Sequence, residues 1–595
     1  MAQNQITLRY FVFRYGELGR QHLFVNVPSS ATILDVIRDV IKTIGSELVR
    51  AENTVLWKPR TFLPKSDPDR LVSLLKQYDH DLSKFCDALD SEAVVSDIFG
   101  VGVRADTITT LVVEVSKPYK AVTVDAAEHA DEAKDVLTKL RKGLQKLRQS
   151  GPSGTPSRNC QPNHYHEHQS GENPILDGRY GNKHTTIAPP VEDFHYAFAQ
   201  FKAECHDEQT PLPEEFVRRI GELMDTVSQI KVDDELGRQA NTRSLLSNIL
   251  SATFGQVVNS LAALAILEEK DELGTSGDGS VQGSFSYLQH WMDQGQKRLF
   301  DACFCPSFII AVAGSYIIIC GAIFTGSVVV HRLTDYIWLA NSRLNDDANA
   351  HRIARVFLAL GNALVRLRDF YEQLENPGPD DVPRYFPLAT AYRDGDRIVK
   401  FRYTSYLKDV AESCVTYRAV ECESDQPREI VVKFVEHYGD AAHELLASHG
   451  LAPKLLYYGN IWLEGPEARG CGSRRMVVME YIEGETAHAM LSASKERAVP
   501  DDVRDAIKRA VKLLHENKMV HGDIRLGNVI IAKPTGAEGE DTGKRVRIVD
   551  FDWAGTEGEV RYPLFLSKVI RWPAGVDDDA LIRPEHDDEM LTRLD

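Results

Sequence analysis

The chain has 595 residues, of which 43% are hydrophobic and 26% charged, so it can build packed cores and, at this length, about three or four domains. Its formal net charge of −18 argues against a protein that coats nucleic acid by bulk electrostatic attraction, because such binding needs clustered Lys and Arg. Nucleic acid is therefore an open but unfavoured partner. Nine cysteines are too few for a disulfide scaffold in so long a chain, which favours reduced thiols.

Neither a secretory signal nor a membrane span is predicted. Charged residues such as Arg9 and Arg14 interrupt the N-terminal segment, unlike the apolar core of a signal peptide. Residues 308–330 form an uncharged stretch of membrane-spanning length, but Gly314 and Gly321 interrupt it and Ile and Val dominate it. That composition favours buried strands joined by tight turns. The oligomeric state is left open.

Residues 1–117 show the pattern of a small mixed domain. Strands at 6–14 and 21–27 flank a turn, a helix opens after Thr32 and runs to about residue 44, and further strands follow. A hairpin, a helix and later strands predict a ubiquitin-like β-grasp fold.

The segments VNVPSSATILDVIRDVIKTI, NTVLWKPRTFL and TTLVVEVSK in this region resemble the ubiquitin-like N-terminal domain of Crinkler-type effector proteins of the fungal kind. The resemblance covers about a fifth of the chain. It implies release from the producing organism and action inside another cell, often in its nucleus. Because no signal peptide is visible, the cytoplasm or nucleus of the producing cell is the alternative location.

Residues 118–190 are predicted to connect this domain to the next. Residues 131–148 fit an amphipathic helix with leucines on one face and basic residues around it, which favours a solvated connector over a nuclear-import patch. Residues 150–190 are rich in Gly, Pro, Ser, Asn and His and predict a disordered linker. Side chains of the kinds that bind zinc occur here without a second ligand pair at finger spacing; they are Cys160, His164, His166 and His168.

Residues 191–376 predict an α/β domain. Its expected elements, in order, are helices at 191–205, 213–230 and 241–255, a strand at 264–270, a helix at 285–300, the uncharged β stretch, and a long helix at 347–375.

Glu268, Glu269 and Lys270 end the apolar strand of this domain, and Gln282 opens the following helix. The arrangement resembles the core of restriction-endonuclease-like folds of the PD-(D/E)xK type. The resemblance implies that Glu268 holds a divalent ion and that Lys270 polarises the attacking water. The aspartate expected about ten residues earlier is absent, and Glu235 is the only reasonable extra ligand. A degenerate scaffold is therefore favoured over a metal-dependent nuclease.

Residues 385–595 carry a catalytic-loop pattern. In the octet HGDIRLGN, Asp523 precedes Asn528 by five positions; an apolar strand follows, and Asp550 then opens the triplet DFD. Phosphoryl transfer needs one carboxylate to orient the acceptor's proton, and an amide and a second carboxylate to hold magnesium on the nucleotide phosphates. The order resembles the catalytic and metal loops of the protein-kinase-like superfamily, in an HGD form.

The resemblance implies a two-lobed domain that uses ATP and Mg²⁺. Asp523 is the expected catalytic base, and Arg525 the expected contact to the γ-phosphate. Asn528 and Asp550 are the expected magnesium ligands. Asp552 stands where a glycine is usual and could add charge near the metal.

The nucleotide site of such a domain also needs a strand lysine and a hinge. Lys433 lies inside the apolar strand EIVVKFV and is expected to pair with the α- and β-phosphates. Glu444, on the following helix, is its expected ion-pair partner. The backbone of Glu480, Tyr481 and Ile482 is expected to meet the adenine.

Three departures from the kinase pattern are visible. Residues 403–417, before Lys433, contain no glycine, so cover of the phosphates by backbone amides is in doubt. Gly522 stands where regulated kinases carry an arginine, and no A-P-E motif follows Asp550. The phosphate acceptor, a protein or a small molecule, is therefore open.

The sequence thus predicts a multidomain α+β protein with an N-terminal β-grasp domain, a central restriction-endonuclease-like α/β domain and a C-terminal kinase-like domain. ATP-dependent phosphotransfer is the favoured function. The alternatives are a non-catalytic pseudokinase that binds a nucleotide or a partner, and a nuclease acting through the middle domain.

Overall fold

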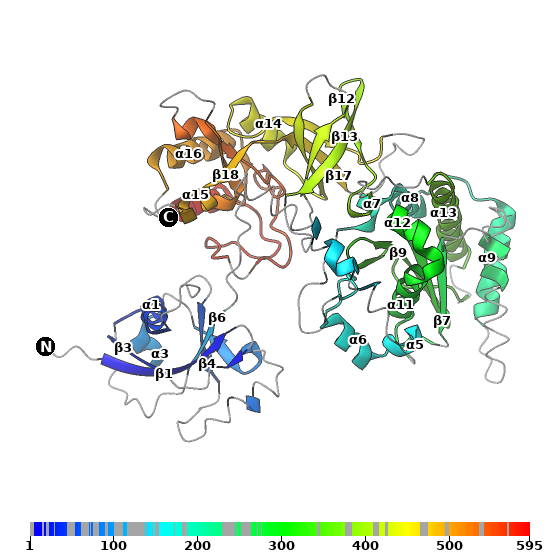
Figure 1. The fold of residues 1–595 in the computed structure, drawn as a ribbon, viewed down its shortest axis with the longest axis horizontal. Helices are drawn as coiled ribbons and strands as arrows, with labels where there is room; N and C mark the ends of the chain where they lie inside the picture. The colour runs from blue at the N-terminus through cyan, green and yellow to red at the C-terminus, as the bar shows by residue number, and fades with distance from the viewer. Residues whose placement is uncertain are drawn as a thin grey trace. The chain divides into compact units, whose positions relative to one another are not determined.

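The computed structural model shows a mixed α/β chain with several separate sheets (Figure 1). It divides into two compact units, Met1–Ala121 with Phe565–Trp572, and Val122–Leu564 with Pro573–Asp595. Apart from a few single positions within them, the residues described are 5–14, 17–18, 23–28, 30–44, 54–60, 71–74, 82–89, 93–99, 111–115, 137–148, 154–180, 186, 189–228, 244–250, 263–270, 272–274, 277–341, 346–374, 383–407, 416–422, 427–463, 474–493, 499–534, 541–567 and 570–594.

The first unit contains a six-stranded sheet in the order β2-β1-β6-β4-β5, with β3 paired to β1. β1 runs antiparallel to β3 and parallel to β6, and helix α1 (Ile33–Ile44) buries Val36 and Val40 in the core of the unit. The hairpin, the helix and the later strands lie near their expected positions, and the β-grasp assignment stays a prediction. The strands are β1 (Gln5–Arg14), β2 (Glu17–Leu18), β3 (Leu23–Pro28), β4 (Thr54–Pro59), β5 (Cys86–Ala88) and β6 (Leu111–Val115), and a short helix α3 (Val95–Phe99) precedes β6.

Two helices of the second unit lie where the sequence predicts a disordered linker. Helices α5 (Pro156–Asn159) and α6 (Pro162–Gln169) each open on a proline, whose fixed φ suits the first helical position. Polar groups secure them: the buried Gln169 donates to the Ile175 carbonyl at 2.9 Å, and Tyr165 donates to the Asp177 carboxylate. The described part of this segment therefore packs on the middle domain. No described cluster of three His, Cys, Asp or Glu side chains could hold a metal ion.

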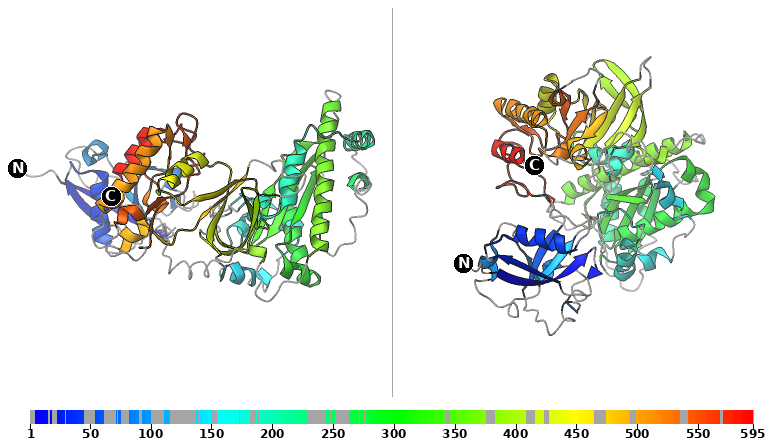
Figure 2. Two further views of the ribbon diagram at one scale, coloured as in Figure 1. Left: turned by 90° about the horizontal axis from the view of Figure 1, so that it is seen from above. Right: turned by 60° about the vertical axis from the view of Figure 1, so that its left-hand side comes forward.

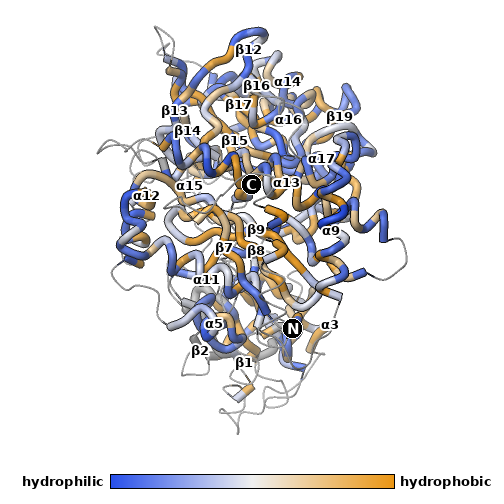
Figure 3. Tube along the Cα trace, turned by 90° about the vertical axis from the view of Figure 1, so that its right-hand side faces the viewer, coloured by the Kyte–Doolittle hydropathy of each residue, from blue (hydrophilic) through white to orange (hydrophobic). Residues whose placement is uncertain are grey.

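The middle domain is built on a five-stranded sheet in the order β10-β9-β8-β7, with β11 paired to β9. β7 and β8 are parallel, and β8, β9 and β10 are antiparallel. These strands confirm the prediction of buried β structure for residues 308–330, and Figure 3 shows them as a hydrophobic centre. None of the described helices is long and apolar enough to cross a membrane. The strands are β7 (Ala265–Lys270), β8 (Ser307–Ala313), β9 (Tyr316–Phe324), β10 (Val328–Arg332) and β11 (Ile337–Trp338).

Helices cover both faces of this sheet. On one face, α11 approaches so closely that a Cβ on Gly283 would lie 2.3 Å from the Ile309 side chain. On the other face, which carries Phe308, the ring of Phe198 packs 5.0 Å away. The helices are α7 (Val191–Phe194), α8 (Tyr196–Cys205), α9 (Glu214–Val227), α11 (Gly279–Met292), α12 (Lys297–Ala302) and α13 (Asp346–Glu372).

The C-terminal part of the second unit has a sheet-rich half and a helix-rich half. The first is an antiparallel six-stranded sheet in the order β12-β13-β14-β15-β17-β16, accompanied by helix α14 (Asp440–Ser448). The second holds helices α15 (Ala487–Ala493), α16 (Asp501–Glu516) and α17 (Pro584–Thr592) and a small sheet in the order β18-β20-β21. The strands are β12 (Ala391–Asp394), β13 (Arg397–Tyr406), β14 (Thr416–Glu421), β15 (Glu429–Val435), β16 (Leu455–Gly459), β17 (Arg475–Glu480), β18 (Gly484–Thr486), β19 (Met519–Val520), β20 (Val529–Ala532), β21 (Val546–Ile548) and β22 (Gly555–Thr556).

The middle domain and the sheet-rich half, which lie next to each other in the ribbon views of Figure 2, are joined by buried side chains. The Arg474 guanidinium binds both carboxylate oxygens of Asp193, at 2.7 and 2.8 Å, and both side chains are largely buried. The connector helix at 137–148 bridges the two cores as well, since Leu140 packs against one and Leu144 against the other. Two domains expected from the sequence thus share one compact unit.

Candidate functional site

Lys433 is buried in the middle of β15, with only 4% of its surface exposed. β14 and β17 pair with β15 on its two sides, so the lysine stem is enclosed by an apolar sheet. An ammonium group in such a place needs carboxylate partners, because burial of an unpaired charge is costly. Its Nζ lies 2.5 Å from Asp550 Oδ1 and 2.7 Å from Asp552 Oδ1.

The loop after β19 brings Asp523, Arg525 and Asn528 together. The short 3-10 turn Leu526–Asn528 folds the chain back, so that the Asn528 amide donates to the Asp523 carbonyl at 3.0 Å and to its carboxylate at 2.7 Å. Arg525 donates from Nη2 to the same carboxylate at 2.8 Å. Because both amide hydrogens of Asn528 are used, its carbonyl oxygen points the other way and is available as a ligand.

The Asp523 carboxylate is almost fully buried. Burial raises the pKa of Asp523, while the Arg525 guanidinium works in the opposite direction. A carboxylate whose pKa is raised towards neutrality is a better proton acceptor than one with an ordinary pKa. The neighbouring His521 is fully buried, and burial lowers its pKa, so this imidazole is neutral and acts as a packing group.

The DFD triplet follows β21 and adopts an unusual backbone. Asp550 has a φ of +70°, a left-handed conformation that non-glycine residues adopt rarely and that is concentrated at functional sites. Phe551 is fully buried, and its ring stacks on His443 of α14 at 4.5 Å with an interplanar angle of 8°. His443 is itself fixed, since its Nδ1 lies 2.7 Å from the Tyr438 hydroxyl and its Nε2 lies 2.8 Å from the Pro453 carbonyl oxygen.

The expected ion pair between Lys433 and Glu444 is not formed. Glu444 is exposed on α14, and Lys433 pairs instead with Asp550 and Asp552. The reason is the phase of the helix: each residue advances the direction by about 100°, and α14 turns the adjacent His443 inward. The assignment of Glu444 to the nucleotide site was therefore wrong.

A further site residue, Asp587 of α17, could not be recognised in the sequence. Its carboxylate is fully buried and accepts hydrogen bonds from the backbone amides of His521 at 2.8 Å and Gly522 at 2.7 Å. It also lies 3.3 Å from Nε2 of His515. The backbone at the start of the HGDIRLGN loop is thus fixed by a carboxylate from α17.

Of the residues described above, Lys433, Asn528 and Asp550 line one cleft with about 890 Å³ of empty space, including its open mouth. Its walls combine aliphatic side chains, such as Val431, Met479 and Ile530, with the paired side chains of Lys433 and Asp550. An apolar slot with a few convergent polar groups is typical of a small-molecule site. The remaining lining includes the segment Glu480, Tyr481 and Ile482 together with Leu407, Thr416, Tyr438, Pro453, Gly484, Thr486, Gly527, Asn528 and Val549.

The predicted hinge segment, residues 480–482, borders this cleft. Its Tyr481 side chain is held by Arg418, which is not among the lining residues. The Arg418 guanidinium lies 4.1 Å from the centre of the Tyr481 ring, a cation–π contact. Arg418 is in turn fixed by Glu429, at 2.6 and 2.7 Å. Residues 408–415, where glycines would cover phosphates in kinases, lie outside the described part of the chain.

The donor set at the polar end of the cleft fits a magnesium ion. Asn528 offers an amide oxygen, and Asp550 offers a carboxylate. Hard cations such as Mg²⁺ prefer oxygen ligands and usually take only one or two protein carboxylates beside phosphate oxygens. The residues expected to hold magnesium therefore line the same cleft as Lys433.

The middle domain does not gather a metal centre from its described residues. Gln282 donates to the Glu268 carboxylate at 2.6 Å, whereas Lys270 Nζ lies 3.7 Å from the Cys160 sulfur. Glu235 lies outside the described residues. No described group of three ligand side chains is present, so the nuclease alternative gains no support here.

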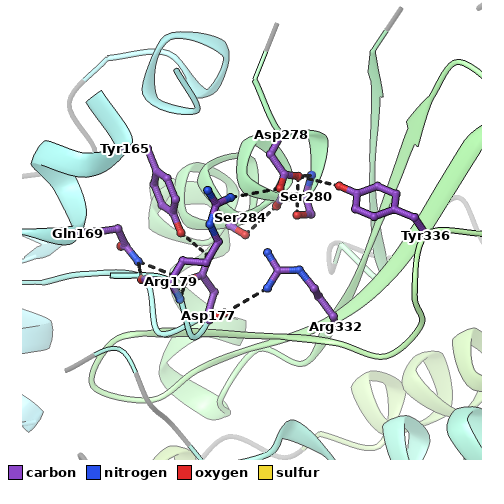
Figure 4. A network of polar contacts seen from close by, with 9 residues as sticks. All are labelled: Tyr165, Gln169, Asp177, Arg179, Asp278, Ser280, Ser284, Arg332 and Tyr336. Atoms are coloured by element: carbon purple, nitrogen blue, oxygen red, sulfur yellow. Dashed lines mark hydrogen bonds and ion pairs between the residues drawn. The ribbon is translucent and has the colours of Figure 1, made fainter. Parts of the chain in front are cut away.

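Beside this cluster, a polar network fixes the start of α11 (Figure 4). Asp278 accepts from the backbone amide of Ser280 at 2.8 Å and from the Tyr336 hydroxyl at 3.0 Å. Arg179 reaches the same carboxylate at 3.4 Å. These contacts cap a helix and tie residues 173–180 to it, which is a structural role.

No protein-family model and no curated protein matches the sequence. Among solved structures, the chain is similar to the kinase PK-1 of Cydia pomonella granulovirus, with 17% identity over 28% of this chain and 58% of that one, and a TM-score of 0.20. It is also similar to vaccinia related kinase 3, with 15% identity over 39% of this chain and 71% of that one, and a TM-score of 0.23. The match thus spans less than two thirds of the granulovirus kinase. At such TM-scores these likenesses carry no weight for function, which rests on the side chains of the cleft.

Proposed function

We propose that residues 385–595 form a kinase-like domain that transfers a phosphoryl group from ATP to an acceptor hydroxyl. The observation that carries this proposal is the convergence of Lys433, Asn528 and Asp550 on one apolar cleft, with Asp523 bonded to Asn528 behind it. These residues come from strands and loops up to 117 positions apart in sequence. Local structure alone gives no reason for a lysine, an amide and carboxylates to meet there.

Each residue then has a chemical task. Asp523 accepts or orients the proton of the acceptor hydroxyl, and its hydrogen bonds from Asn528 and Arg525 hold the carboxylate in place. Lys433 binds the α- and β-phosphates, and Arg525 balances charge near the transferred group. Asn528 and Asp550 hold magnesium, which neutralises phosphate charge. The segment 480–482 receives the adenine.

The acceptor is a protein or a small molecule, and the two are distinguished by assay. Full-length protein incubated with γ-labelled ATP and Mg²⁺ should release or transfer label. Asp523→Asn should lower turnover about a hundredfold or more while nucleotide binding persists, because only the proton acceptor is lost. Asp505→Asn, on the exposed face of α16, is the matched control and should behave as wild type.

The non-catalytic alternative makes a different prediction with the same samples. If the wild-type protein is stabilised by MgATP in a thermal-shift assay but turns over no faster than Asp523→Asn, the domain is a nucleotide-binding interaction module. If neither binding nor turnover is observed, the kinase proposal fails.

We further propose that the N-terminal unit is a β-grasp domain of the Crinkler type and that the protein acts inside a cell other than its producer. The hairpin β1–β3, the helix α1 and the parallel pairing of β1 with β6 support the fold assignment. Detection of tagged protein within recipient cells would support the location. Retention in the producing cell would favour its cytoplasm or nucleus.

A further inference from the structure

Two carboxylates share the ammonium group of Lys433, and they are not equivalent. Asp550 Oδ1 lies 2.5 Å from Nζ and Asp552 Oδ1 lies 2.7 Å from it. Asp550 lines the nucleotide cleft beside Asn528, where the proposed magnesium ion binds, whereas Asp552 is not among the lining residues. Magnesium bound at Asp550 would compete for that carboxylate. With magnesium bound at Asp550, the carboxylate of Asp552 would remain as the partner of Lys433.

Helix α14 does not supply either of the two carboxylates that pair with Lys433. Its inward position is occupied by His443, which stacks on Phe551, and Glu444 faces solvent. The helix is therefore tied to the DFD triplet by an aromatic stack, and the counter-charge of Lys433 comes from the triplet itself. Phe551 and Asp552 are adjacent, so a single turn of chain supplies both the anchor for α14 and the partner for the lysine.

We infer that Asp552 is the positioning residue for Lys433, taking the part that a helix glutamate was expected to play. This inference rests on the proposed function, because a positioned lysine matters only if nucleotide phosphates bind beside it. The Lys433 side chain is long and has several rotatable bonds, so a fixed carboxylate restricts its ammonium group to the end of the cleft that meets the phosphates. The glycine that is usual at this position could not do so.

The test compares ADP binding by full-length wild type, Asp552→Asn, Asp552→Glu and Glu444→Gln, each in Mg²⁺ and in EDTA. Asp552→Asn keeps the shape but removes the charge, and we expect ADP affinity to fall about tenfold or more in both conditions, as loss of one charge-assisted contact implies. Asp552→Glu should restore much of the affinity. Glu444→Gln should stay within about twofold of wild type.

Each of the following outcomes would contradict one part of the proposal. If Asp552→Asn weakens binding only when Mg²⁺ is present, Asp552 is a metal ligand and the positioning role is wrong. Equal or tighter binding by Asp552→Asn in EDTA also removes it, as does a loss in Glu444→Gln as large as that in Asp552→Asn. Wild-type protein that binds no ADP in either condition refutes the proposed function itself. Melting temperatures without nucleotide identify any variant that is simply misfolded.

Discussion

The carboxylate of Asp587 accepts a hydrogen bond from the backbone amide of Gly522 at 2.7 Å, so the start of the HGDIRLGN loop is bonded to a helix more than sixty residues further along the chain. Gly522 has a φ of +80°, and a Cβ there would lie 2.9 Å from the Ile582 side chain. The glycine of the HGD form is therefore required by the backbone and by its close neighbour. The absence of an arginine at this position therefore has a structural reason.

Replacing Asp587 by asparagine should damage both stability and turnover. One acceptor oxygen becomes an amide group that faces backbone donors, and a buried charge-assisted bond is worth about 1.5–3 kcal/mol. Urea unfolding should show a loss of that size, with turnover reduced further because the loop holding Asp523 is released. Asp588→Asn, one position along and exposed, loses only a surface pair with His515 at 3.8 Å, so it should change stability by less than about 1 kcal/mol and leave turnover unchanged. A wild-type melting curve for Asp587→Asn would contradict the anchoring role.

Gly522→Ala should be more harmful than an ordinary glycine replacement. The positive φ disfavours alanine, and the contact with Ile582 adds a clash, so we expect a loss of about 1–3 kcal/mol in the free energy of unfolding. Gly221→Ala serves as the comparison, because that glycine lies within α9 and has open space around it. There we expect a gain of about 0.5–1 kcal/mol, since alanine favours the helix.

The Asp193–Arg474 pair predicts strong coupling between the middle domain and the six-stranded sheet that carries Lys433. Removal of one partner of a buried ion pair costs about 3–5 kcal/mol, because the other charge is left without its counter-charge. Asp193→Asn and Arg474→Met should each approach that loss in chemical unfolding, and the double variant should lose much less than the sum. Additive losses would show that the pair does not act as a unit.

Stability should fall when the pH is lowered from about 6.5 to 4. Burial lowers the pKa of His443 to about 4, below its ordinary value near 6.5, so the unfolded chain takes up a proton first. The stabilising contribution is complete above about pH 6.5 and is lost as the pH falls through the folded-state value. His443→Gln should flatten this part of a stability–pH curve, whereas His449→Gln, on an exposed position, should not. Parallel curves for wild type and His443→Gln would refute this account.

The site residues that could be predicted are those that belong to short sequence motifs. HGDIRLGN and DFD name Asp523, Asn528 and Asp550 without knowledge of the fold. The partner of Lys433 could not be named, because α14 has apolar residues on either side of His443 and Glu444 and so does not fix which of the two points inward. Asp587 could not be named either, since two adjacent aspartates on a helix give no sign of which one is buried.

The prediction of a disordered linker was wrong for residues 154–180, and for another reason. Its composition is that of a linker, and α6 has the sequence PNHYHEHQ, with almost no apolar pattern. It packs nevertheless, because Tyr165 and Gln169 exchange hydrogen bonds with Asp177 and nearby backbone. Hydrophobic periodicity detects segments that are buried through apolar side chains. It does not detect a segment that is held in place by buried polar contacts.

Two sets of contacts determine which fragments of this protein can fold. They are those of the helix at 137–148 and those of the Asp193–Arg474 pair. A fragment that starts after residue 382 would retain every proposed catalytic residue, yet it would remove Asp193 from the Arg474 guanidinium and uncover the surface on which Leu140 packs. Such a fragment should aggregate or unfold at a lower temperature, and a lack of activity in it would not test the proposed function of the full-length protein. A fragment meant to preserve this compact unit should therefore include residues 137–594.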